Sequence, residues 1–195
     1  MMRNADVSRR TGETDIRITL ALDVPDGRDS RIHTGNGFFD HMMELFAFHG
    51  GFLLNIECRG DTEVDFHHSA EDIGITLGRA FTDALGDKRG INRYGSIALP
   101  MDEALVIAAV DICGRGTLGW GLRLPAEQIG GFDTELACEF FTAFCREFGA
   151  AVHLFQLAGT NTHHILEAAF KGFGRALRQA VELGGSGVMS TKGVL

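Results

Sequence analysis

The sequence repeats one polar pattern, and this repeat constrains the fold more than any other feature. Residues 67–84 and 163–180 align without gaps, with seven identities in 18 positions. The shared positions include two adjacent histidines, a glutamate three residues after the second histidine, and a Gly-Arg-Ala triplet. Upstream, a glutamate, an aspartate and an arginine recur in the same order: Glu13, Asp23 and Arg28, then Glu103, Asp111 and Arg115. We interpret these recurrences as an internal duplication.

Hydrophobic periodicity predicts the elements of the first half. Apolar residues at every second position from Ile16 to Leu22 are typical of a strand with one buried face. Apolar residues at four-residue steps from Ile73 to Leu85 predict an amphipathic helix that ends at Gly86. In this half we expect strands at 15–23, near 32, at 52–58 and at 62–66, a turn at 25–30, and helices within 36–51 and 67–86.

The second half follows the same scheme. We expect strands at 103–112, 117–124 and 151–159 and helices at 133–149 and 163–185. The sequence therefore predicts an α+β fold of two similar halves, residues 1–92 and 93–195, each a strand–strand–helix–strand–strand–helix unit. A pseudo-twofold axis should relate the halves, and helices should cover one face of each sheet. No proline- or serine-rich linker separates the halves, so we expect one compact unit.

Composition narrows the class of protein. The 195 residues carry a net charge of −8, which argues against a nucleic-acid partner because such proteins usually have a basic surface. No apolar stretch is long enough to span a membrane, and the N-terminus lacks the apolar core of a secretory signal. The four cysteines form no CxxC pair and suit buried, reduced thiols in the cytoplasm: Cys58, Cys113, Cys138 and Cys145.

The histidine doublets have the residue types and the spacing of a metal site. On a helix, a glutamate three or four residues after a histidine lies on the same face. Adjacent histidines point about 100° apart, so a doublet is better placed to serve two ions than to chelate one. Two such helix starts facing each other would bind two ions, each through one histidine from each helix. With one further histidine from the first helix and one from the strand at 151–159, the candidate ligands are His41, His67, His68, Glu71, His153, His163, His164 and Glu167.

Imidazole and carboxylate ligands without thiolate suit Mn, Fe, Zn or Ni, and open octahedral positions favour Mn or Fe.

The histidine doublets also have a competing, purely structural interpretation. A single HHxxE match is more often structural than ligating, and His153 between two apolar residues resembles a satisfied core histidine. Recurrence at corresponding positions of both halves favours the metal site. His33 and His49 are interpreted as structural.

Five segments carry a resemblance to a known family: FFDHMMELFAFHGGF, GDTEVDFHHSAEDIGITLG, GDKRGINRYG, GTNTHHILEAAFKGFGRALRQA and the terminal STKGVL. Together, from Arg10 to Leu195, they resemble imidazoleglycerol-phosphate dehydratase, an enzyme of histidine biosynthesis. The resemblance implies removal of water from imidazole glycerol phosphate, giving imidazole acetol phosphate, with two Mn²⁺ ions per active site. It also implies a 24-subunit octahedral assembly built from trimers, with active sites at subunit interfaces.

The resemblance also implies roles for individual residues. The metal ligands of the family fall on the eight candidates named above. Glu13 matches a glutamate of the active site, although its residue type alone suggests an exposed side chain at a strand start. The candidates for proton transfer are Glu13, Glu167 and, less strongly, Glu71, and the sequence does not distinguish them. For the substrate phosphate, the resemblance implies cationic and hydroxyl groups that suit an anion: Arg93, Arg115, Lys171, Ser190 and Lys192.

A base alone does not explain the reaction, because the C2 hydrogen of the glycerol chain is not acidic. If metal ions bind both ring nitrogens, the ring is held as an imidazolate, and its electron density can expel the neighbouring hydroxyl through a diazafulvene-like intermediate. The C2 proton then becomes acidic.

Two other classes of protein would show part of the same ligand pattern. A dinuclear metallohydrolase would use the same ligands without binding an imidazole, and a metal-assembled storage particle would show no turnover.

Overall fold

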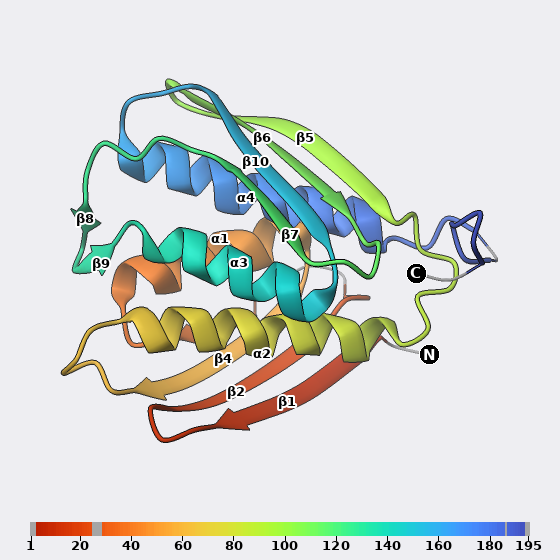
Figure 1. The fold of residues 1–195 in the computed structure, drawn as a ribbon, viewed down its shortest axis with the longest axis horizontal. Helices are drawn as coiled ribbons and strands as arrows, with labels where there is room; N and C mark the ends of the chain where they lie inside the picture. The colour runs from red at the N-terminus through yellow and green to blue at the C-terminus, as the bar shows by residue number, and fades with distance from the viewer. Residues whose placement is uncertain (1–2, 25–28, 186, 194–195) are drawn as a thin grey trace.

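The computed structural model describes residues 3–24, 29–185 and 187–193. In these residues, two four-stranded sheets form the outer layers and four helices pack between them (Figure 1). The first half contains, in chain order, β1 (Asn4–Arg10), β2 (Thr14–Ala21), β3 (Arg31–His33), α1 (Gly37–Gly50), β4 (Leu53–Gly60) and α2 (His67–Leu85). The second half contains β5 (Tyr94–Met101), β6 (Ala104–Asp111), β7 (Thr117–Gly121), β8 (Gln128–Ile129), β9 (Phe132–Asp133), α3 (Leu136–Phe148), β10 (Ala151–Ala158) and α4 (Thr162–Val181).

The two sheets have the same topology. Their strand orders are β1-β2-β4-β3 and β5-β6-β10-β7, and in each the last pair is parallel while the other pairs are antiparallel. The predicted α+β fold of two similar halves is therefore confirmed. The predicted strand–strand–helix–strand–strand–helix order is wrong, because in each half at least three strands precede the first helix and a single strand lies between the two helices. The boundary at residues 92 and 93 falls between α2 and β5 and remains a prediction. None of the helices in the described part of the chain combines the length and hydropathy of a membrane span.

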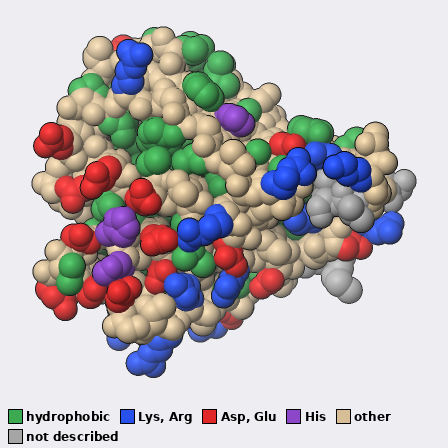
Figure 2. Space-filling model, in the orientation of Figure 1, with side chains coloured by type: hydrophobic (Ala, Val, Ile, Leu, Met, Phe, Trp, Pro, Cys, Tyr) green, Lys and Arg blue, Asp and Glu red, His purple; other side chains and the backbone are tan. Residues whose placement is uncertain are grey.

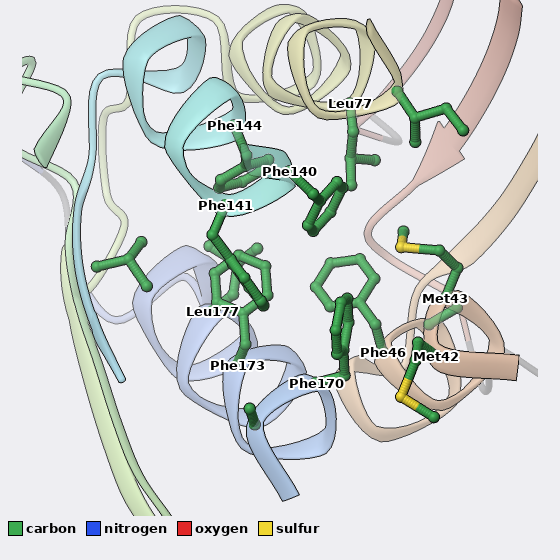
Figure 3. Packing of buried hydrophobic residues seen from close by; sticks show 14 of the residues in the cluster. Met42, Met43, Phe46, Leu77, Phe140, Phe141, Phe144, Phe170, Phe173 and Leu177 are labelled. Atoms are coloured by element: carbon green, nitrogen blue, oxygen red, sulfur yellow. The ribbon is translucent and has the colours of Figure 1, made fainter. Parts of the chain in front are cut away.

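The helices of the two halves pack against one another across the middle of the molecule. α1 contacts α4, and α2 contacts α3, while α2 covers β1 and β2 and α4 covers β5 and β6. Figure 3 shows Phe46 of α1, Phe141 of α3 and Phe173 of α4 pointing toward one another, and Phe173 stacks on Phe46 with centroids 5.1 Å apart. Gly174 permits the close α1–α4 contact, because an added Cβ would lie 2.5 Å from the carbonyl oxygen of Phe46. One aromatic core therefore joins both halves.

The predicted strand at residues 62–66 is wrong. These residues form a turn and a loop between β4 and α2, in which Val64 donates its backbone N–H to Asp61 at 2.9 Å. The alternating pattern misleads there because the apolar side chain of Val64 is 66% exposed and has no sheet to pack against. The turn predicted at 25–30 lies partly outside the described residues, since 25–28, including Arg28, are not described.

Two edge strands were not predicted. In β1 only Val7 is buried, and the strand is held by backbone pairing with β2 rather than by an apolar face. β5 contains Pro100, which is tolerated because β5 lies at the edge of its sheet. The hairpin of β8 and β9 is an insertion of the second half that has no counterpart among the described elements of the first.

Candidate metal centre

Local caps fix the helix starts that carry the candidate ligands. Oδ1 of Asn161 accepts the backbone N–H groups of His163 at 2.9 Å and His164 at 3.3 Å. The rings of this doublet lie at 82° to each other with centroids 6.2 Å apart. The two imidazoles therefore face different surroundings, as expected for neighbours on a helix.

His163 faces α1 and forms the centre of a small polar cluster. His41, His163 and Glu167 each offer one ligand atom, and these atoms lie within 4.8 Å of one another. Nε2 of His163 is 3.2 Å from Oε2 of Glu167, and Phe38 packs edge-on against the His163 ring. Within the described part of the chain, this is the only group of three or more histidine, cysteine, aspartate or glutamate side chains spaced to bind an ion.

Glu167 is ionised in this cluster although it is only 8% exposed. Burial opposes the ionisation of Glu167, but the hydrogen bond and the charge of Lys171 outweigh it, so the pKa lies below its ordinary value. Lys171 follows one helical turn later and forms an ion pair with the Glu167 carboxylate. Two imidazoles and an ionised carboxylate are a donor set that suits a divalent transition metal.

The first doublet has different neighbours. At the start of α2, Oδ1 of Asp65 accepts the backbone N–H of His67 at 2.7 Å. Nδ1 of His68 lies 3.0 Å from Oδ2 of Asp61, and Nε2 of the same ring lies 3.7 Å from Glu13. The hydrogen bond to Asp61 raises the pKa of His68, and the Glu13 charge adds to this effect.

In the single chain, Glu71 pairs with another helix and not with the two histidines of its own doublet. Its carboxylate forms an ion pair with Arg146 of α3 at 3.1 Å. The single chain therefore does not bring His67, His68 and Glu71 together with the cluster around His163.

His164 has a carboxylate partner of its own. Its Nδ1 lies 2.7 Å from Oε2 of Glu103, and Oε1 of the same carboxylate accepts the backbone N–H of Asn161 at 2.9 Å. The hydrogen bond to His164 lowers the pKa of Glu103 to about 2, and the same bond raises the pKa of His164. Neither Asp61 nor Glu103 was predicted as a site residue, although the repeat had already identified Glu103 as the counterpart of Glu13.

His153 lies apart, on the outer face of β10. It is opposite Gly119 of β7, where an added Cβ would lie 2.2 Å from Nδ1 of His153. The glycine-rich sequence of β7 thus makes room for this imidazole. His153 lines a shallow pocket together with Tyr94 and Asp111. It is therefore an accessible donor that belongs to the sheet surface and not to the cluster around His163.

Most residues predicted to bind phosphate gather at the other end of α4. The guanidinium of Arg93 donates to Asp111 at 2.7 Å and to the carbonyl oxygen of Met189 at 2.8 Å. Ser190 follows directly, and its Oγ accepts the backbone N–H of Lys192 at 3.2 Å.

Arg115 is exposed in the loop between β6 and β7, at the same end of the sheet as Arg93. Lys171 is the exception among the predicted phosphate residues, because it pairs with Glu167 in the histidine cluster. Figure 2 shows histidine and acidic side chains at one end of the molecule and a group of Lys and Arg side chains at the opposite end.

A known family matches most of the chain. A family model described as imidazoleglycerol-phosphate dehydratase matches residues 34–177, which begin just before α1 and end within α4. The chain belongs to the imidazoleglycerol-phosphate dehydratase family. The predicted family and the predicted enzyme class, a hydro-lyase, are thereby confirmed.

Full-length relatives and solved structures agree with this assignment. The imidazoleglycerol-phosphate dehydratases of Pelobacter propionicus and Cereibacter sphaeroides are 53% and 52% identical to the chain, over 100% of each sequence. The crystal structure of the enzyme from Staphylococcus aureus is 40% identical, with a TM-score of 0.82, and covers 92% of this chain and 99% of its own. That from Pyrococcus furiosus is 39% identical, also with a TM-score of 0.82, over 97% and 100%.

Proposed function

We propose that the chain removes water from imidazole glycerol phosphate, giving imidazole acetol phosphate, in the cytoplasmic synthesis of histidine. We further propose that the reaction requires two divalent metal ions, Mn²⁺, at each active site. The observation that carries the proposal is the cluster of His41, His163 and Glu167 in a chain of the dehydratase family. The free state of all four cysteines is consistent with a reducing compartment.

The cluster has the chemistry that a divalent ion needs. Two imidazoles and an ionised carboxylate provide three donor atoms without a thiolate, and Lys171 keeps the carboxylate charged. The remaining predicted ligands are His67, His68, Glu71, His153 and His164. When bound, the ions would act as Lewis acids on the two nitrogens of the substrate ring and hold the ring as its anion.

The arrangement of one chain supports an active site shared between chains. Arg93 lies beside Ala180, and His163 begins the same helix, so these ends of α4 are about 25 Å apart at 1.5 Å per residue. A substrate with three carbons between its ring and its phosphate cannot reach from one end to the other. The histidine cluster of one subunit must therefore meet the basic end of a neighbour, as the predicted 24-subunit assembly would allow.

The exposure of the three candidate glutamates favours Glu13 for proton transfer. Glu167 is buried and paired with Lys171, and Glu71 is paired with Arg146. The side chain of Glu13 is 54% exposed at the tip of the β1–β2 hairpin. Its backbone is fixed there, because its carbonyl oxygen accepts the N–H of Asp61 at 3.0 Å. An exposed carboxylate on a fixed backbone can accept a proton from a bound substrate.

For the substrate phosphate, the chain offers Arg93, Arg115, Ser190 and Lys192 at one end of the molecule. Arg93 already holds the backbone of Met189, so its guanidinium orders the segment that carries Ser190 and Lys192. Lys171 lies at the other end and would approach the phosphate only from the subunit that supplies the histidine cluster.

A dinuclear metallohydrolase is the alternative, because it would use the same donors. The test incubates the Mn²⁺-loaded protein with imidazole glycerol phosphate and follows both the ketone product and free phosphate. We expect ketone formation with no phosphate release. Release of phosphate from this substrate or from a simple phosphate ester, without ketone, would instead establish the hydrolase.

A further inference from the structure

In the second histidine of each doublet, Nδ1 lies within hydrogen-bond distance of a carboxylate. Nδ1 of His68 lies 3.0 Å from Asp61, and Nδ1 of His164 lies 2.7 Å from Glu103. The carboxylates nearest Nε2 are farther away, Glu13 at 3.7 Å from His68 and Asp102 at 3.6 Å from His164. Aspartate and glutamate are ionised near neutral pH and then only accept hydrogen bonds. Nδ1 of each ring must therefore carry the proton. In the neutral imidazole, Nε2 is then the nitrogen with a free lone pair.

The two carboxylates come from loops that do not correspond in the two halves. Asp61 follows β4, whereas Glu103 lies in the hairpin between β5 and β6. The corresponding hairpin of the first half carries Glu13, whose carboxylate faces Nε2 of His68, at 3.7 Å, and not Nδ1. Duplication alone would have reproduced one loop twice. The same contact at Nδ1 therefore arises from two different loops.

Hydrogen bonds hold the backbone of Asp61 and the carboxylate of Glu103 in place. The N–H of Asp61 donates to the carbonyl oxygen of Glu13 at 3.0 Å, which ties the loop after β4 to the β1–β2 hairpin. Oε1 of Glu103 accepts the N–H groups of Asn161 at 2.9 Å and Thr160 at 3.3 Å, which leaves Oε2 for His164. Each imidazole is thus held by an acceptor that is itself anchored.

We propose that Asp61 and Glu103 are positioning residues that fix the Nδ1–H form of His68 and His164 and so present Nε2 of each ring to a metal ion. The inference rests on the proposed metal-dependent function. The two carboxylates act through the histidines and do not touch the substrate. Loss of such a hydrogen-bond partner of a metal ligand typically weakens metal binding by about 10–100-fold.

Two amide variants test the role of Asp61 and Glu103 with little change in side-chain size. In Asp61→Asn and Glu103→Gln, an amide NH₂ group turned toward Nδ1 donates and forces the proton onto Nε2. Glu103→Gln keeps its carbonyl oxygen for the backbone N–H groups before α4. Glu63→Gln is the matched control, because Glu63 is exposed in the same loop as Asp61. Calorimetric titration of Mn²⁺ into the metal-stripped full chain should show binding about 10–100-fold weaker in each amide variant and unchanged in the control.

A spectroscopic readout separates positioning from folding. Nitrogen NMR of ¹⁵N-histidine in the metal-stripped wild type, at a pH where the imidazoles are neutral, should show the Nδ1–H form for His68 and His164. This measurement on the wild type tests which nitrogen carries the proton, even if a variant fails to fold. Nε2–H forms in the wild type would overturn the inference, as would wild-type Mn²⁺ affinity in both amide variants. A wild type that binds no Mn²⁺ at all would instead overturn the proposed function, and with it the metal role of both carboxylates.

Discussion

The backbone N–H of Arg93 donates to the carbonyl oxygen of Ala180 at 2.8 Å, which fixes this arginine at the end of α4 opposite His163. One chain therefore presents the cluster of His41, His163 and Glu167 and most of its candidate phosphate ligands at opposite ends. An active site that used both sets would take residues from two chains.

Mixing two inactive variants tests the shared site. His163→Ala removes a metal ligand, and Arg93→Ala removes a phosphate ligand, so each homogeneous assembly should lose most of its turnover. If each site takes the two residues from different chains, a co-assembled 1:1 mixture should recover up to about a quarter of the wild-type rate, because a quarter of the sites are intact. Turnover is measured after the assemblies are dissociated, mixed and allowed to reassemble in the presence of Mn²⁺, with each variant taken alone through the same steps. A mixture as inactive as its components would place both residues in one chain's site.

Glu13→Gln tests the assignment of proton transfer. The side chain is exposed and is no ligand of the cluster around His163, so metal content should not change. We expect kcat to fall by about 10²–10⁴-fold, the usual contribution of a general acid or base. Steady-state kinetics and elemental analysis on the same preparation check both expectations. Full turnover with normal metal content would exclude Glu13 from the mechanism.

Gly174→Ala tests the close packing of α1 against α4. Alanine favours helix over glycine by about 1 kcal/mol. The added Cβ would nevertheless lie 2.5 Å from the carbonyl oxygen of Phe46, which cannot move without displacing α1. We expect a net loss of about 1–3 kcal/mol in the free energy of unfolding, as for other overpacked sites. Gly37→Ala, in open space at the start of α1, is the control and should cost nothing in the same denaturant titration.

Asp23 should make stability depend on acidity. Its hydrogen bond from Arg3, assisted by the Arg3 charge, lowers the pKa of Asp23 below its ordinary value of 3.8, although partial burial opposes this. The folded state therefore binds the proton less tightly than the unfolded state, so the stabilisation is fully present above pH 3.8 and is lost as pH falls through the folded-state value.

The variant Asp23→Asn carries no charge at any pH and isolates this effect. We expect it to be less stable than the wild type at pH 6, by no more than about 1 kcal/mol because the pair is partly exposed. The difference should shrink below pH 4 as the wild-type carboxylate takes up its proton. Asp83→Asn, at an exposed position of α2, is the control. A stability difference that stays constant down to pH 3 would contradict the assignment.

Strong local patterns made most of the fold predictable. The alternation from Ile16 to Leu22 gave β2 because those side chains bury one face, and all of Ile16, Ile18 and Leu20 are at most 2% exposed. β1 carries no such pattern, since its only buried side chain is Val7. Its pairing with β2 depends on backbone groups, which every sequence provides, and so could not be predicted.

The candidate site was predictable to the extent that it is repeated. The second copy of the HHxxE pattern distinguished the doublets from chance, and the pairing of His163 with Glu167 follows from helix geometry. The contact of Asp61 with His68 depends on how the loop after β4 folds back, which no periodicity encodes. The separation of His163 from Arg93 likewise results from the length of α4 in the folded chain and not from any motif.

The requirement of turnover for metal tests the central claim most directly. The protein is stripped with a chelator, and formation of imidazole acetol phosphate from imidazole glycerol phosphate is measured as Mn²⁺ is returned. The account predicts no turnover in the stripped protein and full recovery when two ions are bound per active site, with His163→Ala unable to recover. Full turnover by protein shown to contain no metal would contradict it.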